Sequence, residues 1–419
     1  MTGRPEYSGS FLDKIVEGLL VLLPPAALLG PWAGSGRVFG YRILVVLLVG
    51  CAVTGWIYPI WVRRFSRAAC AIVVVAVAWA VTGVVGAMRL GPRRDLSSLM
   101  GAGLALAGAW SVARLLTHRL LRRARALRDV ASGWAVAVWV GAPLAVWEIL
   151  TARHLGTYAD GAWRNHPGLY RPPATWLTNP NLYAVFLAVG SVWVGVVGVR
   201  SATRWVRIAA IATAVTGLGL LLATDSRIVY AALLLAVMVR LWAVRRWRWV
   251  LPGVVMVVVV VIVVTHLHQA GLVWHRFIGV LIHHNDEGPS SFAVRTTLLA
   301  WGLALVMEYP LLGAGPGGYR ANILAAPKRW FPHGKSDPHN GILEIASQYG
   351  LVVTALVAVC WCLAIGRCWR SRRWWGAALI TAMPVLSLAN STYLVQSVNQ
   401  LGWLVCVLAA SSSRQETPQ

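Results

Sequence analysis

Long apolar runs, broken at intervals by short polar connectors, dominate the pattern of residues along this chain. A bilayer core of about 30 Å takes a helix of about 20 apolar residues, and many of the runs have this length. They are continuous and rich in Leu, Val and Ala, without the two-residue alternation of a membrane barrel. The pattern therefore predicts transmembrane helices, which satisfy their own backbone groups. About twelve are expected, near residues 11–30, 41–62, 69–89, 97–116, 130–150, 179–199, 206–224, 228–243, 250–266, 340–366, 375–390 and 396–411.

The connectors divide the chain, because most of them are short and two are long. The fold class expected is an all-α polytopic membrane protein with a helical module between its ninth and tenth spans. A helix near 292–307 is expected in that module, begun by Ser290 and Ser291 and stopped by Pro310. The expected segments are five spans in 1–150, a loop at 151–178, four spans in 179–266, the module at 267–339, three spans in 340–411 and a tail at 412–419.

Basic residues orient the spans, because clusters of arginine fall in alternate connectors. By the positive-inside rule these connectors, and with them both termini, are cytoplasmic, and the two long loops face the other side. The clusters are Arg63, Arg64 and Arg67; Arg119, Arg122, Arg123, Arg125 and Arg128; Arg200, Arg204 and Arg207; Arg240, Arg245, Arg246 and Arg248; and Arg367, Arg370, Arg372 and Arg373.

Composition agrees with a bilayer setting, since 58% of the residues are hydrophobic and only 12% are charged. The formal net charge of +24 is of the size seen in nucleic-acid-binding proteins. Here the basic residues are dispersed over the ends of apolar helices, where they set topology and contact anionic headgroups. A nucleic-acid partner is therefore rejected.

One polar segment on the outer face has the character of a reactive site. In Ser336–Asn340, Asp337 is expected as the helix cap, Pro338 as the first helical residue, and His339 with Asn340 as the first turn of the tenth span. The positive end of the helix dipole disfavours imidazolium, so His339 is expected to be neutral and able to accept a proton. Asn340 recurs with Glu344 and Gln348 at intervals of four, which predicts one stripe that faces the bundle interior. The alternative for the histidine is a capping or headgroup contact.

Two arginines are expected on the same face. Arg227 follows the polar turn 223–226 between two apolar runs, and Arg295 lies in the helix of the module. A guanidinium fork matches the oxygens of a pyrophosphate and neutralises its charge. Anchoring to lipid headgroups is the alternative interpretation for each.

Taken in order, several segments resemble the O-antigen ligase family, which also holds related polymerases and protein O-oligosaccharyltransferases. The resemblance covers roughly residues 175–365. The segments that carry it are Thr178–Ala184 (TNPNLYA), Thr224–Arg227 (TDSR), Val294–Arg295 with Pro310–Gly317 (PLLGAGPG), and His339–Ile345 (HNGILEI) with Gln348–Gly350 (QYG).

The resemblance implies a GT-C-like glycosyltransferase of the bacterial inner membrane. Such an enzyme transfers a glycan from undecaprenyl pyrophosphate to lipid A-core oligosaccharide on the periplasmic face, in lipopolysaccharide biosynthesis. His339 matches the family's proposed base, and Arg227 and Arg295 match its essential arginines. The reaction is expected to be metal-independent and inverting, with no cofactor, and the outer face shows no DxD or HxxxH metal pattern.

Further contacts to substrate are expected beside these three residues. Tyr319 and Arg320 are candidate phosphate or sugar contacts, and Gly315 belongs to a Gly313–Gly318 stretch that either forms a phosphate-binding nest or simply turns the chain. Asn179 and Asn181 either bind substrate or cap a helix, and Asn340 is expected to contact substrate as well. The alternatives in function are an O-antigen polymerase or a protein O-oligosaccharyltransferase, and, from another class, a secondary transporter, which would tend to show matching repeats with broken helices.

Overall fold

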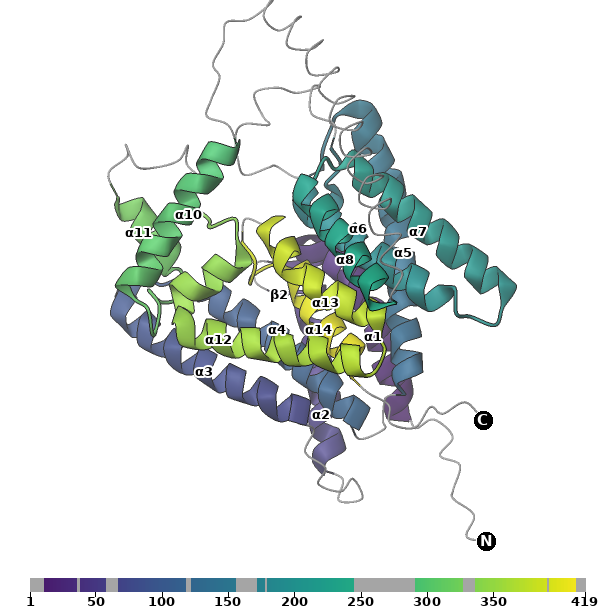
Figure 1. Cartoon of the computed structure of the whole chain (residues 1–419), viewed down its shortest axis with the longest axis horizontal. Coiled ribbons are helices and arrows are strands. Elements are labelled where there is room, and N and C mark those ends of the chain that lie inside the picture. The colour runs from purple at the N-terminus through teal and green to yellow at the C-terminus, as the bar shows by residue number, and fades with distance from the viewer. Residues whose placement is uncertain are drawn as a thin grey trace, which may run out of the picture.

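The computed structural model describes residues 11–35, 38–57, 67–117, 122–155, 172–177, 179–244, 291–326, 336–389 and 392–411. These parts of the chain are almost entirely helical (Figure 1). The α-helices are α1 (Phe11–Leu29), α2 (Gly40–Ile57), α3 (Arg67–Leu90), α4 (Ser97–Thr117), α5 (Arg123–Thr151), α6 (Pro180–Gly198), α7 (Arg204–Ala223), α8 (Arg227–Ala243), α10 (Ser291–Glu308), α11 (Gly318–Ala325), α12 (Gly341–Arg370), α13 (Trp374–Leu386) and α14 (Ser397–Ala410). The 3-10 turns are η1 (Gly30–Ala33), η2 (Gly91–Arg93), η3 (Thr175–Leu177) and η6 (Ser387–Ala389), and β1 (Gly34–Ser35) pairs antiparallel with β2 (Val38–Phe39).

A helix lies at each predicted span except the ninth, near 250–266, which falls outside the described residues. Seven of these helices are long and apolar enough to cross a bilayer, and three shorter apolar helices accompany them. The helix expected near 292–307 is also present, as α10. An all-α membrane protein is thereby confirmed, whereas the number of twelve spans and the division into membrane and extramembrane segments stay predictions.

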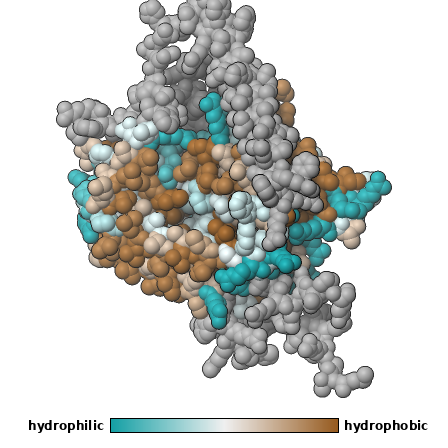
Figure 2. Space-filling model, viewed as in Figure 1, coloured by the Kyte–Doolittle hydropathy of each residue, from teal (hydrophilic) through white to brown (hydrophobic). Residues whose placement is uncertain are grey.

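Apolar side chains cover much of the outside of the bundle. Figure 2 shows hydrophobic residues over the middle of one face and hydrophilic residues toward its edges. On α3 and α7, large aliphatic side chains such as Val77 and Val215 are more than half exposed. Exposed apolar surface of this extent is unfavourable in water and is expected where lipid is the solvent.

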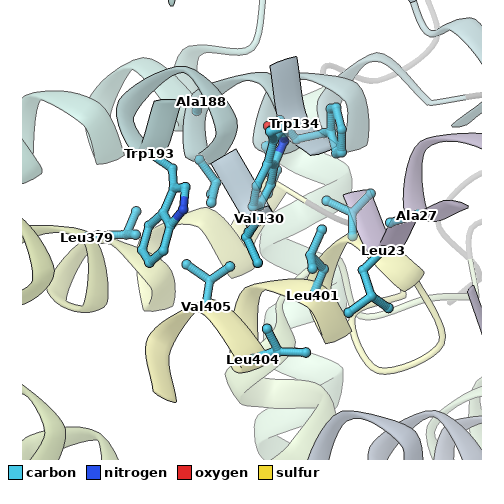
Figure 3. Packing of buried hydrophobic residues seen from close by; sticks show 14 of the residues in the cluster. Leu23, Ala27, Val130, Trp134, Ala188, Trp193, Leu379, Leu401, Leu404 and Val405 are labelled. Atoms are coloured by element: carbon cyan, nitrogen blue, oxygen red, sulfur yellow. The ribbon is translucent and has the colours of Figure 1, made fainter. Parts of the chain in front are cut away.

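The main core lies where α1, α5, α6, α13 and α14 meet. Its two largest side chains, Trp134 and Trp193, are buried and surrounded by aliphatic residues from these helices (Figure 3). Their indole N–H groups donate to the carbonyls of Phe186 and Leu127, each at 3.2 Å, so neither aromatic ring buries an unpaired donor. A second cluster joins α3, α4 and α12, and a third joins α10 to α11.

Helices that are joined by short connectors run in opposite directions. Short connectors turn α3 back into α4 and α12 back into α13, where Trp361 Nε1 donates to Ile380 O at 2.8 Å. Helices α8 and α13 are antiparallel as well, because Arg240, near the end of α8, lies over the ring of Trp375 at the start of α13. The start of α8 and the end of α13 therefore lie at the same end of the bundle. Helices α10 and α11 stand beside the start of α12 (Figure 1).

Candidate active site

The start of α12 is set by Asn340 and not by Asp337. The helix begins at Gly341, and Asn340 Oδ1 accepts hydrogen bonds from the amides of Ile342 and Leu343, both at 3.1 Å. His339 lies just before this cap with φ 49°, a left-handed conformation that residues other than glycine seldom adopt. The prediction that His339 and Asn340 form the first turn is wrong, because His339 turns the chain in a left-handed conformation and the helix begins only after Asn340.

The N-terminal part of α12 is a separate short helix. Gly350 breaks α12 with φ 81° and ψ 174°, and the break leaves the carbonyls of Ser347 and Gln348 without partners inside the helix. The amides of Ala314 and Gly315 donate to these two carbonyls at 2.7 and 2.9 Å. The helix that follows His339 is therefore held at its far end by the glycine-rich segment.

The polar stripe on this short helix faces inward, as predicted. Glu344 and Gln348 are 2% and 5% exposed. The carboxylate of Glu344 accepts from the amides of Tyr393 and Leu394 at 2.5 and 3.5 Å. These bonds hold the segment before α14 against the start of α12, where a side chain at Gly341 would meet the ring of Tyr393.

The Gly313–Gly318 segment donates its amides within the protein. Besides the two bonds to α12, Gly317 N donates to Gln348 Oε1 at 2.6 Å and Gly318 N to Gly315 O at 2.8 Å. We therefore place no phosphate on these amides. Gly315, a predicted substrate contact, is buried instead against α3, where a Cβ atom would lie 2.6 Å from Gly86 O.

Tyr319 and Arg320 differ in their environment. Tyr319 is 1% exposed, and its hydroxyl donates to Leu298 O of α10 at 2.7 Å. Burial raises the pKa of this phenol, and the charge of Asp337 raises it further. The predicted substrate contact through Tyr319 is therefore replaced by a role in the α10–α11 core, whereas Arg320 is exposed and remains a candidate.

Arg295 lies on α10, which packs against α12 and α11. It is partly buried, and this burial lowers the pKa of its guanidinium. An arginine nonetheless keeps its charge in proteins, so a cation stands in a poorly solvated position. Such a position strengthens attraction to an anion.

Arg227 is the first residue of α8 and is exposed. The turn before it needs the left-handed conformation of Asp225, with φ 54°. Ser226 is buried, and its hydroxyl donates to Asn181 Oδ1 at 2.7 Å. This bond ties the turn that carries Arg227 to the start of α6.

The two asparagines at the start of α6 have structural partners. Asn179 caps α6, since its Oδ1 accepts from the amide of Asn181 at 2.9 Å. Asn181 accepts from Ser226 as described above. The capping alternative is thus confirmed for Asn179, and Asn181 positions the turn before Arg227.

The starts of α8 and α12 meet at η6. This turn contacts α6, α8 and α12, and a side chain at Gly341 would lie 2.9 Å from Ser387 Cβ. Because α8 and α13 are antiparallel, the end of α8 that faces η6 is the one that carries Arg227. His339 and Arg227 consequently lie at the same end of the bundle, around one short turn.

The α3–α4 connector reaches the same region, which the pattern of charges had not indicated. Arg89 Nη1 donates to Gly313 O at 3.4 Å, and its guanidinium lies 5.4 Å from the centre of the Tyr309 ring. Ser98 Oγ donates to Gln348 Oε1 at 3.3 Å. The signal in the sequence was the presence of Arg93 and Arg94 in this connector, because the alternation of arginine clusters assigns the connector to the outer face.

Some expected features cannot be placed. Most of the loop at 151–178 lies outside the described residues, and so do residues 267–290 and 327–335 of the module at 267–339. Across the ranges that are described, no three His, Cys, Asp or Glu side chains gather as metal ligands do.

Comparison with known proteins identifies the segment that holds these residues. Residues 212–358 match the family model described as O-Antigen ligase, a stretch that contains Arg227, Arg295 and His339 but begins after the α6 asparagines. No curated protein matches the chain. The match agrees with residues 212–358 of the resemblance in the sequence and with the apolar helices of a multi-pass membrane protein. The chain therefore carries an O-antigen ligase family domain in residues 212–358.

Proposed function

We propose that this protein is an O-antigen ligase of the bacterial inner membrane. It transfers a glycan from undecaprenyl pyrophosphate to lipid A-core oligosaccharide at the periplasmic face, with both of its termini in the cytoplasm. The observation that carries the proposal is the placement of His339 and Arg227 around η6, inside the segment that matches the family. A base and a cation at one end of the bundle are what glycan transfer from a lipid pyrophosphate requires.

The reaction balances with these groups alone. The imidazole of His339 takes the proton of an acceptor hydroxyl as its oxygen bonds to the anomeric carbon of the donor glycan. The bond from that carbon to the carrier pyrophosphate breaks, and the pair of electrons leaves with the pyrophosphate. Arg227 and Arg295 stabilise the charge that develops on the leaving oxygens. Attack from the opposite side of the leaving group inverts the anomeric configuration.

The position of His339 suits a base. It directly precedes the N-terminus of α12, where the partial positive charge of the helix disfavours a second positive charge on imidazole. A neutral histidine at working pH is ready to accept a proton. The left-handed backbone of His339 has a cost, and strain of this kind is concentrated at functional sites.

Reconstitution of the purified protein tests the proposal. With carrier-linked glycan and lipid A-core as the only substrates, and without added metal, we expect glycan to appear on lipid A-core. His339→Ala should abolish this transfer while the protein keeps its wild-type thermal stability, because the loss falls on the transition state. Full activity of His339→Ala would contradict the role of the base.

The arginines are tested by the conservative change to lysine. Arg227→Lys and Arg295→Lys keep the charge and lose the planar fork, so each should lower the turnover number. Arg207→Lys is the matched control, since Arg207 is an exposed arginine near the opposite end of α7 and should tolerate the change. If the first two variants turn over normally, headgroup anchoring explains these arginines.

The acceptor separates the related activities. A ligase glycosylates lipid A-core, a polymerase extends a second carrier-linked glycan, and a protein O-oligosaccharyltransferase modifies a polypeptide. We expect product only with lipid A-core when all three acceptors are offered. Product on the carrier-linked glycan alone would identify a polymerase.

A further inference from the structure

An apolar groove lies between α3 and α4, outside the site described above. Its volume is about 290 Å³, close to the lower limit of small-molecule sites, and every residue that lines it is apolar. Trp79 and Ala80 line it from α3, and Leu99, Gly103 and Trp110 from α4. The groove extends along about three turns of α4 and ends, at Leu99, within one turn of the α3–α4 connector.

The bilayer limits what such a groove can select. Lipid chains are as apolar as the groove, so the hydrophobic effect does not favour a chain inside it over a chain in the membrane. A chain is retained there when its headgroup is bound beside the groove, because the linkage makes the second contact intramolecular. The charges at the end of the groove therefore decide the occupant.

Those charges are positive. Arg89, Arg93 and Arg94 lie at the connector and are exposed, against the single carboxylate of Asp95, which accepts from Ser97 N at 2.9 Å. In the described part of the chain Arg93 and Arg94 make no ion pair or side-chain hydrogen bond. This connector is at the end of the bundle where the positive-inside rule disfavours arginine, so topology does not account for the three cations.

The connector is continuous with the candidate active site. Asp95 N donates to Pro316 O at 3.1 Å, and a side chain at Gly317 would meet the backbone of Asp95. The glycine-rich segment is in turn bonded to the short helix that follows His339. A headgroup that leaves the groove at Leu99 thus emerges beside the segment that braces the site.

We propose that the α3–α4 groove holds the isoprenoid chain of the lipid-linked donor, and that Arg93 and Arg94 contact its pyrophosphate. This inference rests on the proposed function, which supplies a donor with an apolar chain and a doubly phosphorylated headgroup. Pyrophosphate carries more negative charge than the single phosphate of a common phospholipid, so it matches a cluster of arginines better. The groove then orients the anomeric carbon toward His339 by holding the rest of the donor.

Filling the groove tests this without disturbing the fold. A Cβ atom added at Gly103 meets no atom within 4 Å, so Gly103→Phe places a ring in the groove without a backbone clash. Gly219→Phe is the matched control, because Gly219 is equally open but lies on α7, away from the groove. Gly103→Phe should raise the KM for the full-length donor about tenfold, equivalent to ~1.4 kcal/mol, with kcat unchanged. A donor with a shortened isoprenoid chain should show little effect, and Gly219→Phe none with either donor.

The headgroup contact gives a different signature. Arg93→Ala with Arg94→Ala should raise the KM for both donors alike, because the pyrophosphate is common to them. Equal KM values for wild type and Gly103→Phe with the long donor would overturn the groove assignment while transfer by the wild type still upheld the ligase. If the double variant has the same KM values as the wild type, these arginines anchor the protein to lipid headgroups, and their assignment to the pyrophosphate is overturned.

Photocrosslinking provides a readout that does not depend on transfer. A diazirine-bearing isoprenyl pyrophosphate should label α3 and α4 of the wild type and lose this labelling in Gly103→Phe. Competition by undecaprenyl pyrophosphate but not by phospholipid is expected. Labelling that phospholipid or lipid A displaces equally well would show that the groove takes ordinary acyl chains, contrary to the proposal.

Discussion

The break in α12 at Gly350 offers the most direct test of how the site is held. With φ 81° and ψ 174°, this residue has a conformation that is almost limited to glycine and that an L-residue adopts at a cost of about 1–3 kcal/mol. A Cβ atom would also lie 2.7 Å from Leu312 N and still closer to Leu311 O. Gly350→Ala therefore cannot be accommodated without moving the segment that leads into the glycine-rich turn.

The size of the effect follows from the bonds that this movement breaks. Ala314 N to Ser347 O, Gly315 N to Gln348 O and Leu351 N to Pro310 O all join the two segments, at 2.7, 2.9 and 2.7 Å. Each such bond contributes about 0.5–1.5 kcal/mol. With the backbone cost added, Gly350→Ala should destabilise the protein by about 3–7 kcal/mol.

Thermal unfolding in detergent, followed by tryptophan fluorescence, measures the change, and glycan transfer reports on the site. Gly366→Ala is the control, because Gly366 lies in the same helix with helical geometry and its Cβ would have only Arg370 Nη2 near it, at 3.8 Å. In a helix, Gly→Ala is stabilising by up to about 1 kcal/mol. If both variants unfold at the same temperature and keep full activity, the break is not what holds the short helix.

Two further predictions concern residues that the structure moved from one role to another. Tyr319→Phe removes the bond to Leu298 O and should lower the free energy of unfolding by about 1 kcal/mol. Its KM for donor should not change, so a raised KM measured in the reconstituted assay would restore Tyr319 as a substrate contact. Asn340→Ala removes the cap of α12 and should cost about 1 kcal/mol in a thermal melt, whereas Asn340→Asp keeps an acceptor oxygen and should melt as the wild type. Equal melting of the alanine variant would show that the cap contributes nothing.

The spans were predictable because bilayer thickness sets their length. Predicted and observed ends of α1, α3, α4 and α8 differ by two residues or fewer. Larger differences occur where a helix extends beyond its apolar run. Helix α5, for example, begins at Arg123 and not near residue 130. Arginine is a good helix former that hydropathy excludes from a span, so the helix continues past the apolar run.

The site was predictable in part. Arg227, Arg295 and His339 could be selected as candidates because each lies in a local sequence motif, and these motifs follow one another within one continuous stretch. The cap of α12 was placed three residues too early, because Asp337 and Asn340 are both good caps and Pro338 favours the first. The left-handed turn at His339 decided between them.

Thus the sequence by itself determined that the chain crosses a membrane on helices, where those helices lie, and which three residues are candidates for the chemistry. These properties depend on the length and composition of local runs. Only the tertiary structure decided which polar residues are committed to holding the fold, because their partners are far away in the chain. Gln348 bonds to Gly317, Glu344 to the amides before α14, and Ser226 to Asn181. A buried polar group must find a partner wherever the fold provides one, and no local pattern records where that is.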